Sequence, residues 1–289
     1  MIDEAAFAVP VVRPGAATET RVVTYDGGVS RKRFDAVATE EPLEIRVVTA
    51  SGTRTVAITM RTPGNDFELA AGFLHNEGVI ASLDDVALID YCTRGDVSIE
   101  QRYNIVSVEL RRELAPDFAP LERHFFTTSA CGVCGKASID ALQARGLTAL
   151  ESDARVASAT IVALAERLRA AQKTFAATGG LHAAGAFSLD GDLVALREDV
   201  GRHNALDKLV GRALLDRALP LRNRIVMVSG RSSYELVQKS VVAGAAIVCS
   251  VSAPSSLAVS LANEFGVTLV GFIRGERFNV YAHPERIVA

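Results

Sequence analysis

The sequence predicts an α/β fold in which a mainly parallel sheet lies between helices, with a smaller β-rich region at the N-terminus. From about residue 125 onward, strand-like and helix-like segments alternate along the chain. Short apolar runs such as Ile225–Val228 suit strands that helices cover on both faces. The chain has 289 residues, of which 49% are apolar, and this is enough for a substantial buried core.

The N-terminal part divides into an arm and a mixed region. Residues 1–20 contain Pro10, Pro14 and Gly15 and show no sustained period, so we expect a flexible arm. Within 21–124, alternating apolar and polar residues predict strands at 43–47, 55–60 and 103–110. The break at 63–66 offers an N-cap, and a helical period then runs until Gly78.

The region 125–289 is expected to form the α/β domain. It carries a pair of cysteines near its start and several polar loops between its strands and helices. Helical periods and short apolar runs predict the elements in order. We predict helices at 138–145, 161–173, 203–217, 233–243 and 255–264, and strands at 193–197, 225–229, 246–251 and 267–273.

Composition narrows the classes of partner. The 31 basic and 34 acidic residues give a net charge of −3, and there is no tryptophan, so we expect no nucleic-acid partner. No N-terminal segment combines the basic region, apolar stretch and small-residue cleavage site of a leader peptide, and no apolar run reaches the roughly 20 residues that span a bilayer. We therefore expect a cytoplasmic protein without a membrane partner, whose four cysteines are reduced.

The segment Cys131-Gly-Val-Cys134-Gly-Lys136 is the strongest candidate for chemistry. Only a thiolate attacks sulfur or binds a metal, and a nearby lysine favours the thiolate. There is no second CxxC pair, so a closed zinc site is disfavoured and we expect no metal. Sulfur transfer and thiol redox chemistry both stay open. Cys249 lies in an apolar run and is expected to be an inert core residue, and Cys92 is expected to be similar.

A second candidate, His75-Asn76-Glu77, matches the H-x-E part of the zinc deaminase signature. In that signature two cysteines follow a proline and bind zinc with the histidine. Here Ala130 precedes Cys131, and His75 falls near the end of an amphipathic helix. We take this match to be accidental.

Four polar loops lie at predicted junctions between strands and helices, where open α/β sheets bind ligands. They are 178–182, 197–204, 229–233 and 252–256. None contains GxGxxG or a P-loop, which argues against an ordinary nucleotide enzyme. Each loop alone could be a turn or a helix cap. His182 is as compatible with a structural role as with a catalytic one, and His203 and Asp207 could form a surface pair four residues apart. Together the loops favour a shared pocket.

Long motifs in the chain resemble the FdhD family of formate dehydrogenase accessory sulfurtransferases. The resemblance covers about residues 35–287. It rests on CGVCGK at 131–136, TGGLHAA at 178–184, REDVGRHNALDKLVG at 197–211, SGRSSYELVQK at 229–239, APSSLAV at 253–259 and GFIRGERFNVYAHPERI at 271–287.

The resemblance implies a sulfur carrier that takes persulfide sulfur from a cysteine desulfurase onto the CxxC loop. It would pass this sulfur to molybdenum in the bis(molybdopterin guanine dinucleotide) cofactor, the form that formate dehydrogenase needs. The resemblance also implies a homodimer with a cytidine deaminase-like fold lacking zinc chemistry. We expect Cys131 to carry the sulfur and Cys134 to assist.

The guanine dinucleotide part of the cofactor would bind at the polar loops and near the C-terminus. The resemblance places the segment 272–277 against this nucleotide. Four arginines could each form a bidentate ion pair with a phosphate, namely Arg202, Arg231, Arg274 and Arg277. The complete set of candidate binding residues is Gly179, Gly180, His182, Arg202, His203, Ser229, Arg231, Phe272, Ile273, Arg274, Gly275, Glu276 and Arg277.

Two other functions fit the same residues. A thiol–disulfide oxidoreductase would use the cysteine pair, but it would leave the polar loops unexplained. A non-catalytic chaperone of the molybdenum cofactor would need the arginine loops but not the cysteines. A sulfur adduct on the peptide 131–134 after incubation with a desulfurase and cysteine would support sulfur transfer, and its absence would favour one of these two functions.

Overall fold

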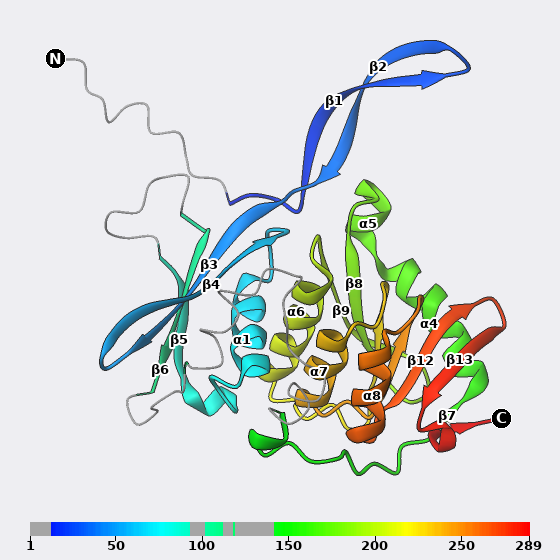
Figure 1. The fold of residues 1–289 in the computed structure, drawn as a ribbon. Helices are drawn as coiled ribbons and strands as arrows, with labels where there is room; N and C mark the ends of the chain where they lie inside the picture. Colours follow the sequence, from blue (N-terminus) through cyan, green and yellow to red (C-terminus); the bar gives the residue numbers. More distant parts are fainter. Residues whose placement is uncertain (1–12, 93–101, 112–117, 119–141) are drawn as a thin grey trace.

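The main feature of the computed structural model is a six-stranded sheet between two layers of helices (Figure 1). The structure describes residues 13–92, 102–111, 118 and 142–289. The strand order is β13-β12-β11-β10-β8-β9. The strands are β8 (His182–Phe187), β9 (Leu193–Asp199), β10 (Ile225–Val228), β11 (Ile247–Ser250), β12 (Thr268–Arg274) and β13 (Arg277–Ala282).

The sheet is mixed, so the prediction of a mainly parallel sheet was wrong. Only β10–β11 and β11–β12 pair in parallel, whereas β8 pairs antiparallel with both β9 and β10, and β12 with β13. The sequence reasoning missed β8 and β13. Each lies one short turn from a neighbouring strand, and so short a connection permits only antiparallel pairing.

Helices cover both faces of this sheet. α4 (Ser158–Ala171) packs on one face, and α6 (Arg202–Leu215), α7 (Tyr234–Val242) and α8 (Ser256–Glu264) lie on the other (Figure 1). Side chains alternate along β10, because Ile225 and Met227 join the α4 cluster whereas Val226 and Val228 join the α6 cluster. The expectation that this strand is buried on both faces is confirmed.

The N-terminal region forms a second sheet with the order β4-β3-β6-β5. Its strands are β3 (Glu41–Thr49), β4 (Gly52–Arg61), β5 (Val86–Tyr91) and β6 (Ile105–Leu110), and α1 (Asp66–Glu77) packs on it. The hairpin of β1 (Ala17–Asp26) and β2 (Val29–Ala38) projects from the rest of the molecule (Figure 1). Since β1 begins at Ala17, the expected arm is shorter than 20 residues.

The two sheets meet where α1 crosses α6. The backbones approach so closely that a Cβ atom added at Gly72 would lie 1.9 Å from the carbonyl oxygen of Asp207. A Cβ at Gly211 would lie 1.8 Å from the carbonyl oxygen of Glu68. Only glycine fits at either position, so this crossing fixes the N-terminal sheet against the larger one.

Several short elements complete the described chain. α5 (Lys173–Thr178) leads into β8, and β7 (Val156–Ala157) pairs in parallel with β14 (Ile287–Val288). Two short 3-10 helices are η2 (Leu83–Asp85) and η4 (Pro284–Arg286). None of the described helices is long and apolar enough to cross a membrane.

Most of the predicted helices and strands are present. The predictions at 161–173, 203–217, 233–243 and 255–264 correspond to α4, α6, α7 and α8, with ends shifted by a few residues. The first half of the predicted helix at 138–145 falls outside the described residues, which contain its helical end at 142–144. The predicted boundary between residues 124 and 125 also lies outside them and stays a prediction, as does the likeness to cytidine deaminases.

Candidate functional site

Sheet topology brings the polar loops together at one edge of the six-stranded sheet. The carboxyl ends of β9, β10, β11 and β12 lie at this edge. Because β8 is antiparallel to β9 and β10, its amino end lies there too, with His182 opposite Asp199 and Ala184 opposite Val228. All four loops singled out from the sequence, and the turn between β12 and β13, therefore share one edge.

A pocket of about 580 Å³ opens at this edge. Gly179, Gly180, His182 and Ser229, all predicted site residues, line it. Its other walls come from α4, α5 and β11, with Arg169, Gln172, Phe175 and Val251 among the lining residues. The Arg169 guanidinium lies over the Phe175 ring, 3.9 Å from its centroid. The pocket thus combines apolar walls with a cation, an amide and an imidazole, as ligand sites commonly do.

Backbone conformation and hydrogen bonds fix the segments that line the pocket. Gly179 ends α5 with a φ of 70°, a left-handed conformation that favours glycine. The Glu198 carboxylate accepts hydrogen bonds from the backbone N–H groups of Thr174 and Phe175 at the start of α5, at 3.0 and 2.7 Å. Ser229 Oγ accepts a hydrogen bond from the N–H of Ala183 at 2.9 Å. Gly179 and Ser229 therefore have structural roles as well as places in the pocket.

His182 is held as a neutral imidazole. Burial lowers its pKa from the ordinary value of 6.5, and the nearby charges of Arg202 and His203 lower it further. Arg202 stands at the start of α6, and its Nε atom is buried without a hydrogen-bond partner in the described part of the chain. The positive charge of Arg202 therefore acts at this edge of the sheet beside a His182 ring whose lowered pKa favours its neutral form.

His203 is partly exposed and contacts α7. Its Nε2 atom lies 2.8 Å from a carboxylate oxygen of Glu235 and 3.4 Å from Ser233 Oγ. The hydrogen bond to His203 lowers the pKa of Glu235. Asp207 is also directed to α7, where it accepts hydrogen bonds from Lys239 Nζ at 2.8 and 2.9 Å. The alternative of a surface pair between His203 and Asp207 is therefore wrong.

The remaining predicted residues lie in two places. Arg231 is exposed in the loop before α7. Near the end of β12, the backbone N–H of Phe272 donates to the carbonyl of Ser252 at 3.1 Å, which places this strand beside the polar loop 252–256. Ile273 is 1% exposed and packs in the α4 cluster, so only its backbone could meet a ligand. The exposed turn that follows consists of Arg274, Gly275, Glu276 and Arg277.

Phe272 is notable for its backbone. Its φ is 55°, a left-handed value that is unfavourable for a residue with a bulky side chain. Such strained residues cluster at functional sites, where the surrounding structure holds them in place. The sequence reasoning named this residue through the resemblance alone, and its conformation coincides with the register shift between Gly271 and Arg274 in the β12–β13 pair.

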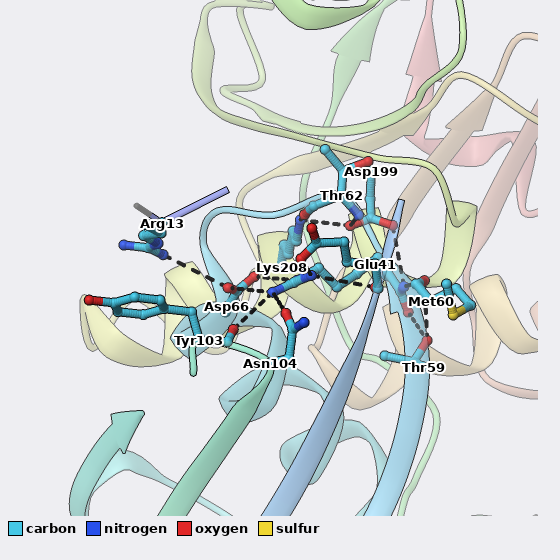
Figure 2. A network of polar contacts seen from close by, with 12 residues as sticks. Arg13, Glu41, Thr59, Met60, Thr62, Asp66, Tyr103, Asn104, Asp199 and Lys208 are labelled. Atoms are coloured by element: carbon cyan, nitrogen blue, oxygen red, sulfur yellow. Dashed lines mark hydrogen bonds and ion pairs between the residues drawn. The ribbon is translucent and has the colours of Figure 1, made fainter. Parts of the chain in front are cut away.

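A buried polar network fixes the loop that precedes α6 (Figure 2). Asp199 accepts hydrogen bonds from the backbone N–H groups of Thr62 and Gly201, and Lys208 Nζ lies 2.6 Å from its carboxylate. Asn204 donates to the carbonyl of Met60 at 2.8 Å. Through these contacts the end of β4 holds the loop 199–204, so the N-terminal sheet positions one wall of the site.

A second centre of polar contacts is Arg61, whose side chain is fully buried and whose partners Asp66, Tyr103 and Asn104 are labelled in Figure 2. It donates to both oxygens of Asp66 at 3.1 and 3.3 Å, to the carbonyl of Tyr103 and to the side chain of Asn104. Sequence reasoning missed this centre. The only available signal was a charged residue at the end of an apolar strand, and its partners come from three separate segments.

The cysteine predictions divide between described and undescribed residues. Cys131, Cys134 and Lys136 lie outside the described residues. Cys249 is fully buried, and burial raises the pKa of its thiol, as expected for an inert core residue. Cys92 is partly exposed, so its predicted likeness to Cys249 was wrong.

The H-x-E segment lies away from the pocket. His75 is largely buried, which lowers its pKa, and it belongs to a separate hollow near the end of α6. Glu77 Oε1 lies 3.6 Å from Lys239 Nζ. Among the described residues no three histidine, cysteine or acidic side chains gather as a metal site would require.

Comparisons with known proteins agree on one family. The model of the FdhD/NarQ family matches residues 38–288. A protein of Streptomyces coelicolor named "Sulfur carrier protein FdhD" is 52% identical over 94% of this chain and 96% of its own length. A protein of the same name from Sulfurisphaera tokodaii is 47% identical over 88% of this chain and 92% of its own.

A solved structure agrees as well. A crystal structure from Desulfotalea psychrophila, described as that of a formate dehydrogenase accessory protein, superposes with a TM-score of 0.72 at 27% identity. It covers 94% of this chain and 100% of its own length.

Proposed function

The chain belongs to the FdhD/NarQ family, and on that premise we propose that it carries sulfur from a cysteine desulfurase to the molybdenum cofactor of formate dehydrogenase. The observation that carries the proposal is the 52% identity with a sulfur carrier protein over nearly the whole chain. The pocket at the sheet edge supports it, because two of the long motifs contribute to its lining through Gly179, Gly180, Leu181, His182 and Ser229.

The first step would load Cys131. Its thiolate attacks the outer sulfur of the desulfurase persulfide, a new S–S bond forms, and the desulfurase cysteine leaves as a thiolate. The persulfide on Cys131 now holds the transferable sulfur. Lys136 would favour the attacking thiolate by its charge.

The second step would release this sulfur in reduced form. Cys134 attacks the inner sulfur of the Cys131 persulfide, so that a Cys131–Cys134 disulfide forms and sulfide leaves toward molybdenum. The two electrons that reduce the sulfur come from the two cysteines. A dithiol reductant must then reopen the disulfide before another cycle. On this view the protein is a sulfurtransferase with a persulfide intermediate.

The bis(molybdopterin guanine dinucleotide) cofactor would bind as the substrate that accepts the sulfur. Arg169, Arg202, Arg231, Arg274 and Arg277 all stand at or near the sheet edge and can pair with phosphates. The Arg169–Phe175 stack and Gln172 offer a flat surface and an amide to a planar base. In a homodimer, two equivalent pockets would each receive one guanine end of the cofactor.

Mass spectrometry tests sulfur loading. After incubation with a cysteine desulfurase and cysteine, we expect the peptide containing Cys131 and Cys134 to gain one sulfur atom. Cys131→Ala should abolish this gain, whereas Cys249→Ala should retain it because Cys249 is sealed in the core. An unmodified peptide in the wild-type protein would contradict sulfur transfer.

Binding of guanosine diphosphate tests the cofactor site separately. Arg277→Ala should weaken it about ten- to a hundredfold, since a charge-assisted contact contributes about 1.5–3 kcal/mol. Arg31→Ala, which removes an exposed arginine of the β1–β2 hairpin, should leave it unchanged. Nucleotide binding without sulfur loading would favour a non-catalytic chaperone, and disulfide exchange without nucleotide binding would favour an oxidoreductase.

A further inference from the structure

Gln172 is a buried polar side chain that lacks a hydrogen-bond partner. It stands between the last residue of α4 and the first residue of α5, and only 4% of it is exposed. Its amide makes no hydrogen bond within the part of the chain that the structure describes. Burial of an amide costs free energy unless its donor and acceptor are paired, so this side chain needs an explanation.

The amide of Gln172 is open to the pocket at the sheet edge. Gln172 is one of the residues that line this pocket. Its amide atoms are not sealed from solvent, unlike Arg202 Nε and Ser232 Oγ, which are buried without a partner in the described chain. Because nearly all of the side chain is buried, the amide reaches solvent through the pocket. Its hydrogen-bonding capacity is therefore available to a ligand there.

The backbone fixes the position of Gln172 from both sides. Its N–H donates to the carbonyl of Arg169 at 3.3 Å, and its carbonyl accepts from the N–H of Ala176 at 3.0 Å. The ψ angle of Gln172 is 80°, which breaks the helical path between α4 and α5. The fold therefore holds an unpaired amide at a defined place in the pocket wall, as a preorganised recognition group requires.

The walls beside this amide suit a flat aromatic ring. Ala165, Leu168 and Val251 supply apolar surface. The guanidinium of Arg169, which has no acidic partner among the described residues, lies flat over Phe175. Aromatic rings and guanidinium planes are the surfaces on which proteins stack nucleobases. A base that enters the pocket therefore meets a stacking surface and an unpaired amide together.

The two sides of the pocket differ in charge and so orient a nucleotide. His182 and Ser229 line it on the side of β8 and β10, and the charge of Arg202 acts on His182 there. A phosphate is stabilised by such a cation. The base therefore belongs beside α4 and α5, with its phosphates directed toward Arg202.

One side chain is available to read the edge of this base. Among the described residues that line the pocket, only Gln172 has a side-chain amide, and none has a carboxylate. An amide provides one donor group and one carbonyl acceptor. On the Watson–Crick edge of guanine these match O6, which accepts a hydrogen bond, and N1–H, which donates one. The 2-amino group of guanine is a further donor, for which Gln172 has no second group.

From these features we propose that Gln172 selects 6-oxopurines. Its Nε2 group donates to O6, and its Oε1 atom accepts from N1–H, while the ring stacks against the pair of Arg169 and Phe175. The 2-amino group is not read. This inference rests on the proposed function, because the base in question is the guanine end of the cofactor. Gln172 is then a specificity-determining residue of the acceptor site.

Isothermal titration of the full-length protein with three probes tests the proposal. They are guanosine diphosphate, inosine diphosphate, which lacks the 2-amino group, and inorganic pyrophosphate. We expect the two nucleotides to bind the wild-type protein within about threefold of each other, since no hydrogen bond distinguishes them. Gln172→Met keeps the length of the side chain but loses both hydrogen bonds. Its affinity for both nucleotides should fall about tenfold, whereas pyrophosphate binding should not change.

Gln172→Glu gives a result that a purely structural role would not produce. A carboxylate only accepts, so it pairs with N1–H and the 2-amino group of guanine rather than with O6. Guanosine diphosphate should still bind, whereas the affinity for inosine diphosphate should fall about tenfold. Gln143→Met and Gln143→Glu are the matched controls. Gln143 is exposed and bonded to Glu264 at the far end of α8, so neither change should affect nucleotide binding.

The outcomes separate this inference from the proposed function. Equal binding of guanosine diphosphate by the wild-type protein and Gln172→Met would overturn the inference alone. The same holds for an unchanged nucleotide preference in Gln172→Glu, for weak binding of inosine diphosphate by the wild-type protein, or for a parallel loss of pyrophosphate binding. A wild-type protein that neither binds guanosine diphosphate nor loads sulfur would overturn both. Circular dichroism checks folding, and if Gln172→Met is unfolded, the wild-type ratio and Gln172→Glu decide.

Discussion

His182 shows how single residues set the charge of the candidate site. Its ring lies at the start of β8, where the pocket, Arg202 and His203 surround it. Burial, and then the neighbouring Arg202 and His203, oppose its protonation, whereas Asp199 favours it more weakly. A neutral imidazole can donate and accept hydrogen bonds at neutral pH, while the arginines provide the charge that attracts phosphates.

This lowered pKa makes stability depend on pH. The unfolded chain takes up a proton at His182 near the ordinary value of 6.5, and the folded protein takes it up only at lower pH. The contribution of the neutral His182 ring to the free energy of unfolding is therefore fully present above pH 6.5. It is lost as the pH falls below that value. We expect the melting temperature to fall more steeply on acidification for the wild-type protein than for His182→Gln.

Thermal unfolding followed by circular dichroism on both sides of that pH measures the difference. His75 also has a lowered pKa, but it is present in both proteins, so the comparison isolates His182. Equal slopes in the two proteins would show that His182 is not held neutral.

At the scale of elements, the crossing of α1 and α6 determines how the two sheets meet. Gly72 and Gly211 face each other, and a Cβ on either would collide with backbone of the opposite helix. The same α6 carries Arg202 and His203 at its start. The crossing thus links the position of the N-terminal sheet to these two residues, which lie near His182 of the pocket.

Replacement of Gly211 by alanine should destabilise the protein. Alanine normally stabilises a helix relative to glycine by about 1 kcal/mol. Here the added Cβ would lie 1.8 Å from a carbonyl oxygen that cannot move aside, so we expect a net loss of about 2–3 kcal/mol in urea unfolding.

Gly15→Ala is the matched control. The nearest atom to its added Cβ is 3.8 Å away, and we expect a change within about 0.5 kcal/mol. A stabilised Gly211→Ala variant would mean that the helices are farther apart than described.

The elements also show which parts of the fold a sequence reveals. Apolar spacing predicted α4, α6, α7 and α8, because one face of each helix packs on the sheet. β8 was missed because its residues 182–187 are mostly alanine and glycine, which give no alternating pattern. β8 runs antiparallel to β10, and together with the antiparallel pairing of β13 with β12 this makes the sheet mixed.

At the scale of the whole molecule, the loops of the site could be predicted but their supports could not. Glycine and serine clusters between strands indicated 178–182 and 229–233 directly. The contacts of Asp199 with Thr62, and of Asn204 with Met60, join residues more than a hundred positions apart. Such pairings depend on how two sheets are placed, and no local pattern encodes that.

The buried pair of Lys208 and Asp199 is where this long-range support can be tested. Lys208 Nζ lies 2.6 Å from the Asp199 carboxylate and 2.8 Å from the carbonyl of Thr62, and both side chains are almost fully buried. Lys208→Met would leave a buried carboxylate without its cation, which should cost about 3–5 kcal/mol in urea unfolding. Loop 199–204 would lose its anchor, so binding of guanosine diphosphate should weaken as well.

The double variant Lys208→Met/Asp199→Asn separates charge from packing. It removes both charges, so it should recover part of the stability that Lys208→Met loses. The exposed pair of Arg217 and Asp84, also at 2.6 Å, is the matched control, and Arg217→Met should change neither stability nor nucleotide binding appreciably because water screens that pair. If Lys208→Met behaved like Arg217→Met, the N-terminal sheet would not support the site through this ion pair, and α6 alone would have to hold the loop in place.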